Sequence, residues 1–425
     1  MATYDLTRTQ LDAALTHNFD AQTRAAILDY LNDAHAFDPK VTVDNEPFPA
    51  NSNADIFSVQ STFATVNTDD PPKVILANTS QNVTLDIVGH HDVLVATGPG
   101  NDQILLNDSG DDLVYSGAGN DVVVGGNGAD TIYGQGGNDL LIAGRGGGSV
   151  FGGDGNDTLS GTSGNDSLYG GNGNDLLMGG TGRHELLVGG NGSDTLFAGT
   201  GNDTLVGGSG NDQLHAGSGT DSIWGGAGND TLYGGSGDAT LNGGDGNDSI
   251  LGGSGPHQLL IGGEGHNTLI AGSGNDTLVA GDDGNVLRAG DGNDLLLGGH
   301  GNDTLYGGSG HASLQGGAGN DYLFGGSGDN TLSGGGGSDT LYGGSGHQSL
   351  VGGSGSDLFI AGTGNETIDG GSGHNTLIFA GSFEDATIST NTHTGITTIA
   401  IAGGPTDKVE DVQTVIFNDN IIKLS

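Results

Sequence analysis

The stretch Gly298-Gly-His-Gly-Asn-Asp-Thr-Leu-Tyr306 is one copy of a nine-residue pattern that fills most of this 425-residue chain. Its sixth position, which we call the slot, is most often Asp, and the residue two positions later is apolar. Because neighbouring side chains of a strand point to opposite faces, Thr-Leu-Tyr predicts a very short strand with one inward side chain. Such strands are stable only when stacked on one another, so the period predicts a solenoid.

The pattern keeps its register through 31 slots, from Asp102 to Asn375. We place the three ten-residue spacings at 102–112, 175–185 and 257–267, which puts His257 in a slot. An unbroken apolar ladder of this length argues against a flexible Gly-rich linker.

The copies resemble the RTX (hemolysin-type calcium-binding) nonapeptide, Gly-Gly-x-Gly-x-Asp-x-U-x with U apolar. The resemblance covers residues 98–378 and implies an all-β fold, a parallel β-roll with two nonapeptides per 18-residue coil. In that family each ion lies between a turn and the matching turn of the next coil. Carboxylate and carbonyl oxygens suit calcium better than magnesium or zinc.

The resemblance therefore predicts Ca²⁺ as the cofactor, on the order of 15–20 ions at one per intact turn pair. The predicted ligands are the slot aspartates: Asp102, Asp112, Asp121, Asp130, Asp139, Asp157, Asp166, Asp175, Asp194, Asp203, Asp212, Asp221, Asp230, Asp248, Asp276, Asp294, Asp303, Asp321, Asp339 and Asp357. Because stacked carboxylates repel one another without a cation, folding and calcium binding should be one equilibrium.

Alternate slots fall on opposite edges of a two-repeat coil, so the slots form two rows. The first row, from Asp102 to Asn375, carries Asp or Asn throughout, and we expect an oxygen ligand from each. The second row, from Asp112 to Glu366, is interrupted and has no Asp from Ala312 onward. We expect the C-terminal turns of the second row to be poor in calcium and held by hydrogen bonds.

Composition sets further limits. With 52 Asp and Glu against 9 Lys and Arg, the formal net charge is −43, which excludes nucleic acids and anionic membranes as partners. The absence of Cys excludes disulfides and thiolate metal sites. No apolar run of about 18 residues predicts insertion into a membrane.

The remaining segments divide into four regions. Residues 1–38 predict a helical N-terminal segment, and residues 39–73 a Pro-rich linker with one strand around 56–66. Residues 74–97 predict a β lead-in to the roll. Residues 379–425 predict a C-terminal β cap, which by the family resemblance also carries a type I secretion signal.

The start of the chain lacks the basic and apolar pattern of a cleavable signal peptide, which agrees with that export route and predicts a secreted, extracellular or cell-surface protein. We expect no enzyme activity. The stretch His184-Glu-Leu-Leu-Val188 begins like a zinc-protease motif but lacks its second His, and no Gly-x-Ser-x-Gly occurs.

Two functions remain open. Resemblance to surface-layer and biofilm-matrix members of the family implies a structural protein that self-assembles into a surface layer, filament or matrix. The alternative is an adhesin that recognises glycan or another surface. Two sets of outward aromatics repeat every 18 residues, and they either stabilise the sheets by stacking or also form a contact surface: Tyr115, Tyr133, Phe151 and Tyr169, then Tyr306, Phe324 and Tyr342.

Histidines accompany the slots that lack Asp. Each either binds a second metal or titrates at a contact surface, or else hydrogen-bonds the turn backbone in place of the usual Asn. The histidines directly before such slots are His184, His266, His311, His347 and His374.

Overall fold

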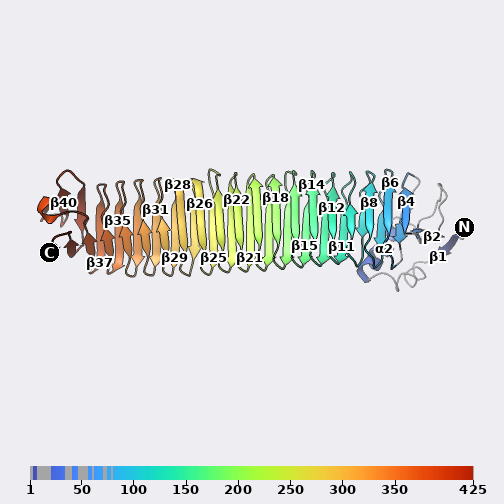
Figure 1. The fold of residues 1–425 in the computed structure, drawn as a ribbon, viewed down its shortest axis with the longest axis horizontal. Helices are drawn as coiled ribbons and strands as arrows, with labels where there is room; N and C mark the ends of the chain where they lie inside the picture. Colours follow the sequence, from blue (N-terminus) through green and yellow to red (C-terminus); the bar gives the residue numbers. More distant parts are fainter. Residues whose placement is uncertain are drawn as a thin grey trace. The chain divides into compact units, whose positions relative to one another are not determined.

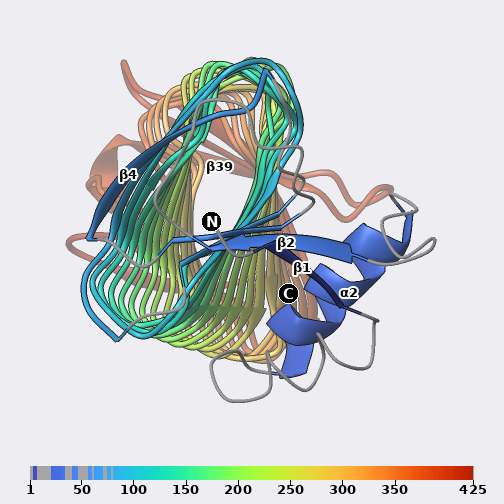
Figure 2. The same cartoon turned by 90° about the vertical axis from the view of Figure 1, so that its right-hand side faces the viewer.

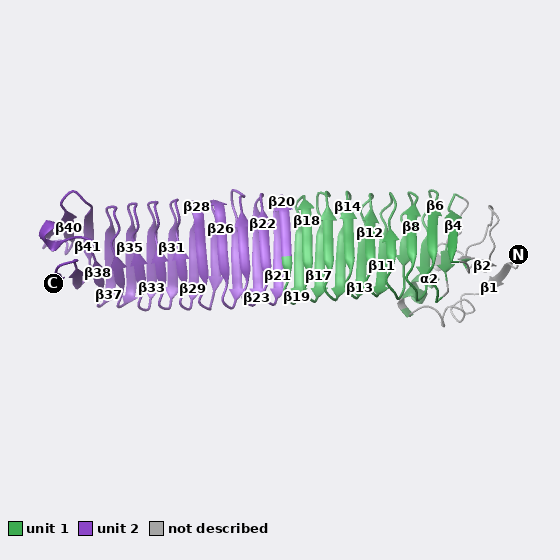
Figure 3. Ribbon diagram, viewed as in Figure 1, with its two compact units in different colours: residues 1–213 green, residues 214–425 purple. Residues whose placement is uncertain are grey.

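The computed structural model describes residues 3–6, 21–33, 41–45, 56–59, 62–69, 74–77 and 80–424. The chain divides into two compact units, residues 1–213 and residues 214–425 (Figure 3). Within each unit the strands stack side by side in two sheets, which we call sheet A and sheet B (Figure 1). The strand β20 (Gln213–Ser218) contains the boundary between the units.

In unit 1, sheet A contains β1 (Thr3–Leu6), β2 (Val41–Asn45), β3 (Ile56–Ser58), β5 (Val74–Ala77), β7 (Leu94–Thr97), β9 (Leu113–Tyr115), β11 (Thr131–Gly136), β13 (Ser149–Asp154), β15 (Ser167–Asn172), β17 (Leu186–Asn191) and β19 (Thr204–Ser209). Sheet B of this unit contains β4 (Phe63–Asn67), β6 (Thr84–Val88), β8 (Gln103–Asn107), β10 (Val122–Val124), β12 (Leu140–Gly144), β14 (Thr158–Thr162), β16 (Leu176–Gly180) and β18 (Thr195–Thr200).

In unit 2, sheet A contains β21 (Asp221–Ala227), β23 (Ala239–Asp245), β25 (Leu259–Glu264), β27 (Thr277–Gly281), β29 (Leu295–His300), β31 (Ser313–Ala318), β33 (Thr331–Gly336), β35 (Ser349–Gly355), β37 (Thr367–Gly373), β39 (Ala386–Thr390), β40 (Thr397–Ile401) and β41 (Thr406–Glu410). Sheet B contains β22 (Thr231–Gly235), β24 (Ser249–Gly253), β26 (Thr268–Gly274), β28 (Val286–Gly292), β30 (Thr304–Tyr306), β32 (Tyr322–Phe324), β34 (Thr340–Tyr342), β36 (Leu358–Ile360), β38 (Thr376–Ile378), β42 (Thr414–Ile416) and β43 (Ile421–Lys423). A 3-10 turn, η1 (Phe383–Asp385), precedes β39.

The predicted all-β roll is confirmed in its strand register. Parallel pairing joins residues 18 apart, as in Ile132 with Val150 and Val150 with Leu168. These inward side chains are fully buried, and so are their equivalents on sheet B, such as Leu159 and Leu177. The core of each unit is therefore a stack of apolar, mostly aliphatic side chains between the sheets.

The turns require glycine because successive backbones come very close. At Gly155 φ is +138°, and a Cβ placed there would lie 1.7 Å from the carbonyl oxygen of Gly137 on the preceding coil. Gln135 is an exception, a side chain held at φ +75°. Its Nε2 donates a hydrogen bond of 2.8 Å to Thr23 Oγ1.

The N-terminal region differs in part from the prediction. The helix α2 (Ala21–Asp33) lies outside sheet A of unit 1 (Figure 2), and it buries Ile27 and Leu28. However, residues 3–6 form a strand that pairs with β2, whereas we had expected a helix there. The parts of the predicted helical segment at 7–20 and 34–38 lie outside the described residues. The described helical segments are too short to span a membrane.

The segment 39–73 is more than a linker. Its strands β2, β3 and β4 join the two sheets, with β3 pairing to β5 and β4 pairing to β6. The one strand predicted around 56–66 corresponds to two strands, β3 and β4, whereas β2 was not predicted. Pro residues surround these strands, and Pro is compatible with the ends of strands.

One ten-residue spacing was also misplaced. Thr240 pairs with Leu259 and Leu241 with Leu260, so the residue beside Ala239 in the slot row is Gln258. Gln258 is 3% exposed, whereas His257 lies on the surface. The long spacing therefore runs from 248 to 258, and the prediction that His257 occupies a slot is wrong.

Candidate metal sites

All the predicted slot aspartates are buried, and most of them hydrogen-bond along the stack in one direction. One carboxylate oxygen accepts the backbone N–H of the slot residue on the preceding coil. In unit 1, Asp139 Oδ1 accepts from Asp121 N at 2.8 Å, and Asp157 Oδ1 accepts from Asp139 N at 2.8 Å. In unit 2, Asp339 Oδ1 accepts from Asp321 N in the same way.

The other oxygen of most slot acids has no hydrogen-bond partner although it is buried. This group comprises Asp102, Asp112, Asp121, Asp139, Asp157, Asp166, Asp175, Glu185, Asp194, Asp248, Asp276, Asp294, Asp303, Asp321, Asp339, Asp357 and Glu366. Asp130 differs because its Oδ2 accepts the N–H of Gly126 at 3.0 Å. A buried, unpartnered carboxylate oxygen is costly, so a cation fits each of these positions.

Backbone oxygens converge on the same points. A Cβ placed on Gly152 would lie 2.3 Å from Asp157 Oδ2 and 2.6 Å from the carbonyl oxygen of Gly170 on the next coil. In unit 2, a Cβ on Gly243 would lie 2.1 Å from Asp248 Oδ2 and 2.6 Å from the Gly262 oxygen. Each intact turn thus combines a carboxylate oxygen with a carbonyl oxygen from the next coil.

The local electrostatics favour a bound cation. The pKa of Asp139 is raised to about 7, chiefly by burial and also by the charges of Asp121 and Asp157, against the opposing effect of its backbone hydrogen bond. Burial likewise raises the pKa of Asp121 to about 6 and that of Asp321 to about 6. The charged form is therefore destabilised at neutral pH unless positive charge is supplied.

The donor set identifies the kind of cation. Across the described residues no three His, Asp or Glu side chains converge closely enough to hold a metal by themselves, so carbonyl oxygens must complete each site. Hard oxygen donors of irregular geometry suit calcium, which takes six to eight of them. The residues present therefore fit the expected group.

Family comparison agrees with this chemistry. The model of the RTX calcium-binding nonapeptide repeat (four copies) matches in segments that run, with short gaps, from residue 95 to residue 377. The chain belongs to the RTX calcium-binding repeat family. It is a β-helical structural protein that binds multiple calcium ions.

No curated protein matches this RTX chain closely enough to count as a relative. A solved structure described as a hyperactive, Ca²⁺-dependent, beta-helical antifreeze protein from an Antarctic bacterium is similar, with 17% identity and a TM-score of 0.29. The match covers 79% of this chain and 90% of that one.

Amide side chains give a second kind of RTX turn. Asn330 Oδ1 accepts the N–H of Ala312 at 2.7 Å, while Nδ2 donates to the carbonyl oxygens of Gly325 at 2.6 Å and Gly328 at 3.1 Å. The backbone N–H requires an acceptor, which fixes the orientation of the amide. The amide nitrogen thus takes the place where other turns present a free carboxylate oxygen.

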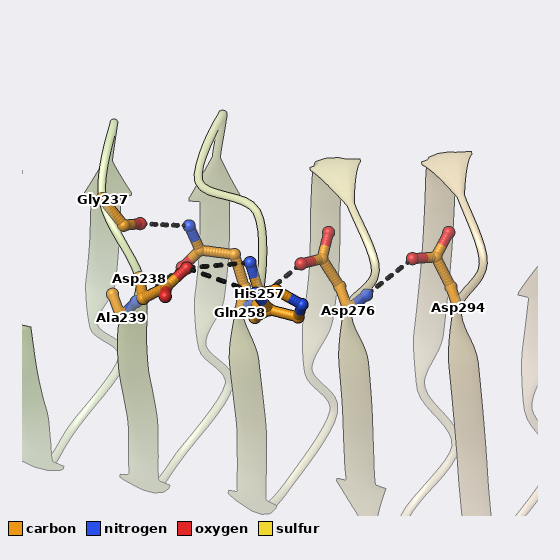
Figure 4. A network of polar contacts seen from close by, with 7 residues as sticks. All are labelled: Gly237, Asp238, Ala239, His257, Gln258, Asp276 and Asp294. Atoms are coloured by element: carbon orange, nitrogen blue, oxygen red, sulfur yellow. Dashed lines mark hydrogen bonds and ion pairs between the residues drawn. The ribbon is translucent and has the colours of Figure 1, made fainter. Parts of the chain in front are cut away.

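Gln258 shows the same exchange (Figure 4). Its Oε1 accepts from Ala239 N at 3.2 Å, and its Nε2 donates to Gly237 O at 2.7 Å. The next slots along this row, Asp276 and Asp294, return to the carboxylate pattern.

This finding corrects the expectation for the first row. Asn267, Asn285 and Asn375 do not offer a free oxygen to an ion, because their Nδ2 atoms donate to turn carbonyls. In the second row, the predicted hydrogen-bonded turns are found at Asn330 and at Gln348, whose Nε2 donates to Gly328 O at 2.6 Å.

Four of the five histidines that precede non-Asp slots contact backbone oxygens of the next coil. The Nδ1 atoms of His184, His266, His311 and His347 lie 3.2, 2.8, 3.2 and 3.4 Å from carbonyl oxygens of Asn202, Gly284, Asp329 and Asn365. These contacts favour the interpretation as turn hydrogen bonds.

Sequence reasoning missed two buried acids. Asp108 replaces a turn glycine and is 4% exposed, and both its carboxylate oxygens lack a partner. The pKa of neighbouring Asp112 is raised to about 8, chiefly by burial and also by the charges of Asp108 and Asp130. Asp407 lies in the C-terminal cap and is fully buried. Neither Asp108 nor Asp407 occupies a slot of the nine-residue period. For Asp108 the only signal in the sequence was the replacement of a motif glycine at this position.

Proposed function

We propose that this protein is exported through a type I route, folds outside the cell on calcium, and self-assembles into a surface layer, filament or biofilm matrix. Support for calcium-driven folding comes from the buried, unpartnered slot carboxylates, since such a stack is unfavourable without cations. Cytosol is poor in calcium, so the acidic chain stays unfolded until export. The proposal assigns the protein no catalytic step.

Support for association comes from an uncharged surface of unit 2, which we call the aromatic face. It consists of the outward residues of β30, β32 and β34: Thr304, Tyr306, Tyr322, Phe324, Thr340 and Tyr342. Tyr322 is 51% exposed. In a chain of net charge −43, such a face is where two copies can approach with the least repulsion.

The rings of this face form a stack. The centroids of Tyr306 and Phe324 lie 4.8 Å apart, those of Phe324 and Tyr342 lie 4.4 Å apart, and the Arg288 guanidinium lies 4.3 Å from the Tyr306 centroid. Stacking covers the ring faces and leaves ring edges outward. A flat row of edges suits contact with another flat sheet better than capture of a single sugar ring.

Electron microscopy at millimolar calcium tests assembly. The wild type should form ordered arrays or filaments that chelation disperses, and Tyr322→Glu should prevent them while circular dichroism stays unchanged. Gln315→Glu adds the same charge on the exposed outer side of sheet A in unit 2 and should assemble as the wild type does. Monodisperse wild-type particles would contradict the proposal.

A glycan-binding adhesin is the second candidate, and one pocket of unit 1 favours it. The pocket has a volume of about 330 Å³ and is lined by Tyr115, Tyr133, Gln135, Phe151, Gly152, Gly153, Asp154 and Asn172. Amide and carboxylate groups beside aromatic rings can bind sugar hydroxyls. Calorimetric titration with oligosaccharides, compared between the wild type and Asp154→Ala, separates this function from assembly.

A further inference from the structure

The C-terminal cap continues the roll instead of merely covering it. We define the cap as residues 379–424, which contain β39 to β43. Its strand β41 pairs in parallel with β37, placing Val409 beside Ile368, and β42 pairs with β38, placing Val415 beside Leu377. Val409 and Val415 are buried. The cap therefore adds one more coil, which the nine-residue period does not predict because the β39–β40 hairpin interrupts it.

This extra coil has its own slots. Asp407 Oδ1 accepts the N–H of Glu366 at 2.8 Å, and Gln413 Oε1 accepts the N–H of Asn375 at 2.7 Å. Both bonds repeat the slot-to-slot pattern of the roll across 41 and 38 residues of sequence. The cap thus docks by the same contacts that join successive coils.

The two edges of this junction differ in charge. At Asn375 and Gln413 both side chains are amides, and their nitrogens donate to Asp411 O at 3.0 and 3.2 Å. At Glu366 and Asp407 both side chains are carboxylates, 2% and 0% exposed. Glu366 Oε1 accepts from Gly362 N at 2.7 Å, whereas Glu366 Oε2 and Asp407 Oδ2 have no partner.

Docking of β41 therefore brings a second buried carboxylate beside the first. Burial raises the pKa of Glu366 to about 8, with the charge of Asp407 as the next cause, and burial raises that of Asp407 to about 6. Lys408 and Glu410 lie on the exposed side of β41, so their side chains point away from the pair. The buried pair lacks the neutralising donors that the amide edge has.

We propose that Glu366 and Asp407 hold a calcium ion that fastens the cap to the last repeat coil. The inference rests on the calcium-driven folding proposed above and extends it to a site outside the nonapeptides. Without the ion, like charges oppose docking on this edge while the amide edge still hydrogen-bonds. With the ion, the carboxylates and nearby carbonyl oxygens become ligands, and the final coil closes. The cap is thus held by hydrogen bonds on the amide edge and by calcium on the carboxylate edge.

Hydrogen exchange of the full chain during a calcium titration tests this. In the wild type, peptides from 397–416 should gain protection as calcium rises. In Asp407→Asn their calcium midpoint should rise about tenfold, or their protection should cease to depend on calcium, because one ligand charge is lost. Glu410→Gln removes the same charge from the exposed face of β41 and should leave the midpoint unchanged.

Two internal comparisons complete the test. Peptides from 157–203 should titrate alike in every variant, and their failure to respond in the wild type would overturn calcium-driven folding itself, separately from the cap site. Glu366→Gln should shift the cap midpoint as Asp407→Asn does, because both remove ligands of one ion. A cap midpoint within about twofold of the Glu410→Gln value in either variant would overturn the proposal.

Discussion

The two units have the same core but different turns. In unit 1 every slot from Asp102 to Asp212 except Gly148 carries a carboxylate. In unit 2 several slots carry amides instead: Gln258, Asn267, Asn285, Asn330, Gln348 and Asn375. A carboxylate turn leaves a buried oxygen for a cation, whereas an amide turn supplies its own donor to the carbonyl oxygens. One architecture is therefore held together in two ways, by ions and by hydrogen bonds.

Removal of calcium should produce the largest difference between the units. Chelation at pH 7.5 should unfold unit 1, because nearly all its slots would hold uncompensated charge, while the amide-rich coils of unit 2 retain partial protection. Circular dichroism should show a large loss of β-sheet signal. Hydrogen exchange measured peptide by peptide would locate the loss of structure. Equal loss of protection in residues 102–212 and 258–348 would contradict the expected difference between the units.

Acidification should partly replace calcium, and more so in unit 1. The raised pKa values mean that the folded chain binds more protons than the unfolded chain, whose Asp groups titrate near 3.8. Protonation of these carboxyl groups therefore stabilises the folded chain. This contribution is complete below about pH 3.8 and is lost as pH rises through about 6 to 8. Amide slots do not titrate.

In chelator, a shift from pH 7.5 to 5.5 should thus restore protection in unit 1 peptides with a steeper pH dependence than in unit 2. The measurement is hydrogen exchange with rates corrected for pH. Further loss of structure in unit 1 on acidification would contradict the assignment of the buried carboxylates.

Reciprocal substitutions give the smallest and sharpest effect. Asp157→Asn should convert one turn of unit 1 to the amide type and lower the calcium stoichiometry by about one ion. Asn285→Asp should do the reverse in unit 2, since its neighbour Asp303 already presents a free oxygen. Equilibrium dialysis measures both. The outward substitution Ser160→Ala serves as control, and an unchanged stoichiometry in both slot variants would refute the two-turn scheme.

Local rules account for most of the fold. The inward ladder and the buried slot aspartates could be predicted because each depends only on residues a fixed distance apart, and stacking repeats the same environment. The aromatic columns followed for the same reason: Tyr115, Tyr133, Phe151 and Tyr169 stack at 4.7 to 4.8 Å.

Periodicity could not locate the long spacing near residue 257, because Leu259 and Leu260 are both apolar and either could point inward. Pairing of Leu241 with Leu260 decides the register and buries Gln258, whose amide can satisfy the turn. The orientation of the amides likewise depends on which backbone groups surround them.

By itself, the sequence determined the repeating coil, its aliphatic core and the abundance of calcium ligands, since these arise from contacts that recur along the chain. Only the tertiary structure decided which slots present a free oxygen and which donate a hydrogen. It alone brought Asp407 beside Glu366, because that contact joins segments separated by a hairpin and depends on how the final strand docks.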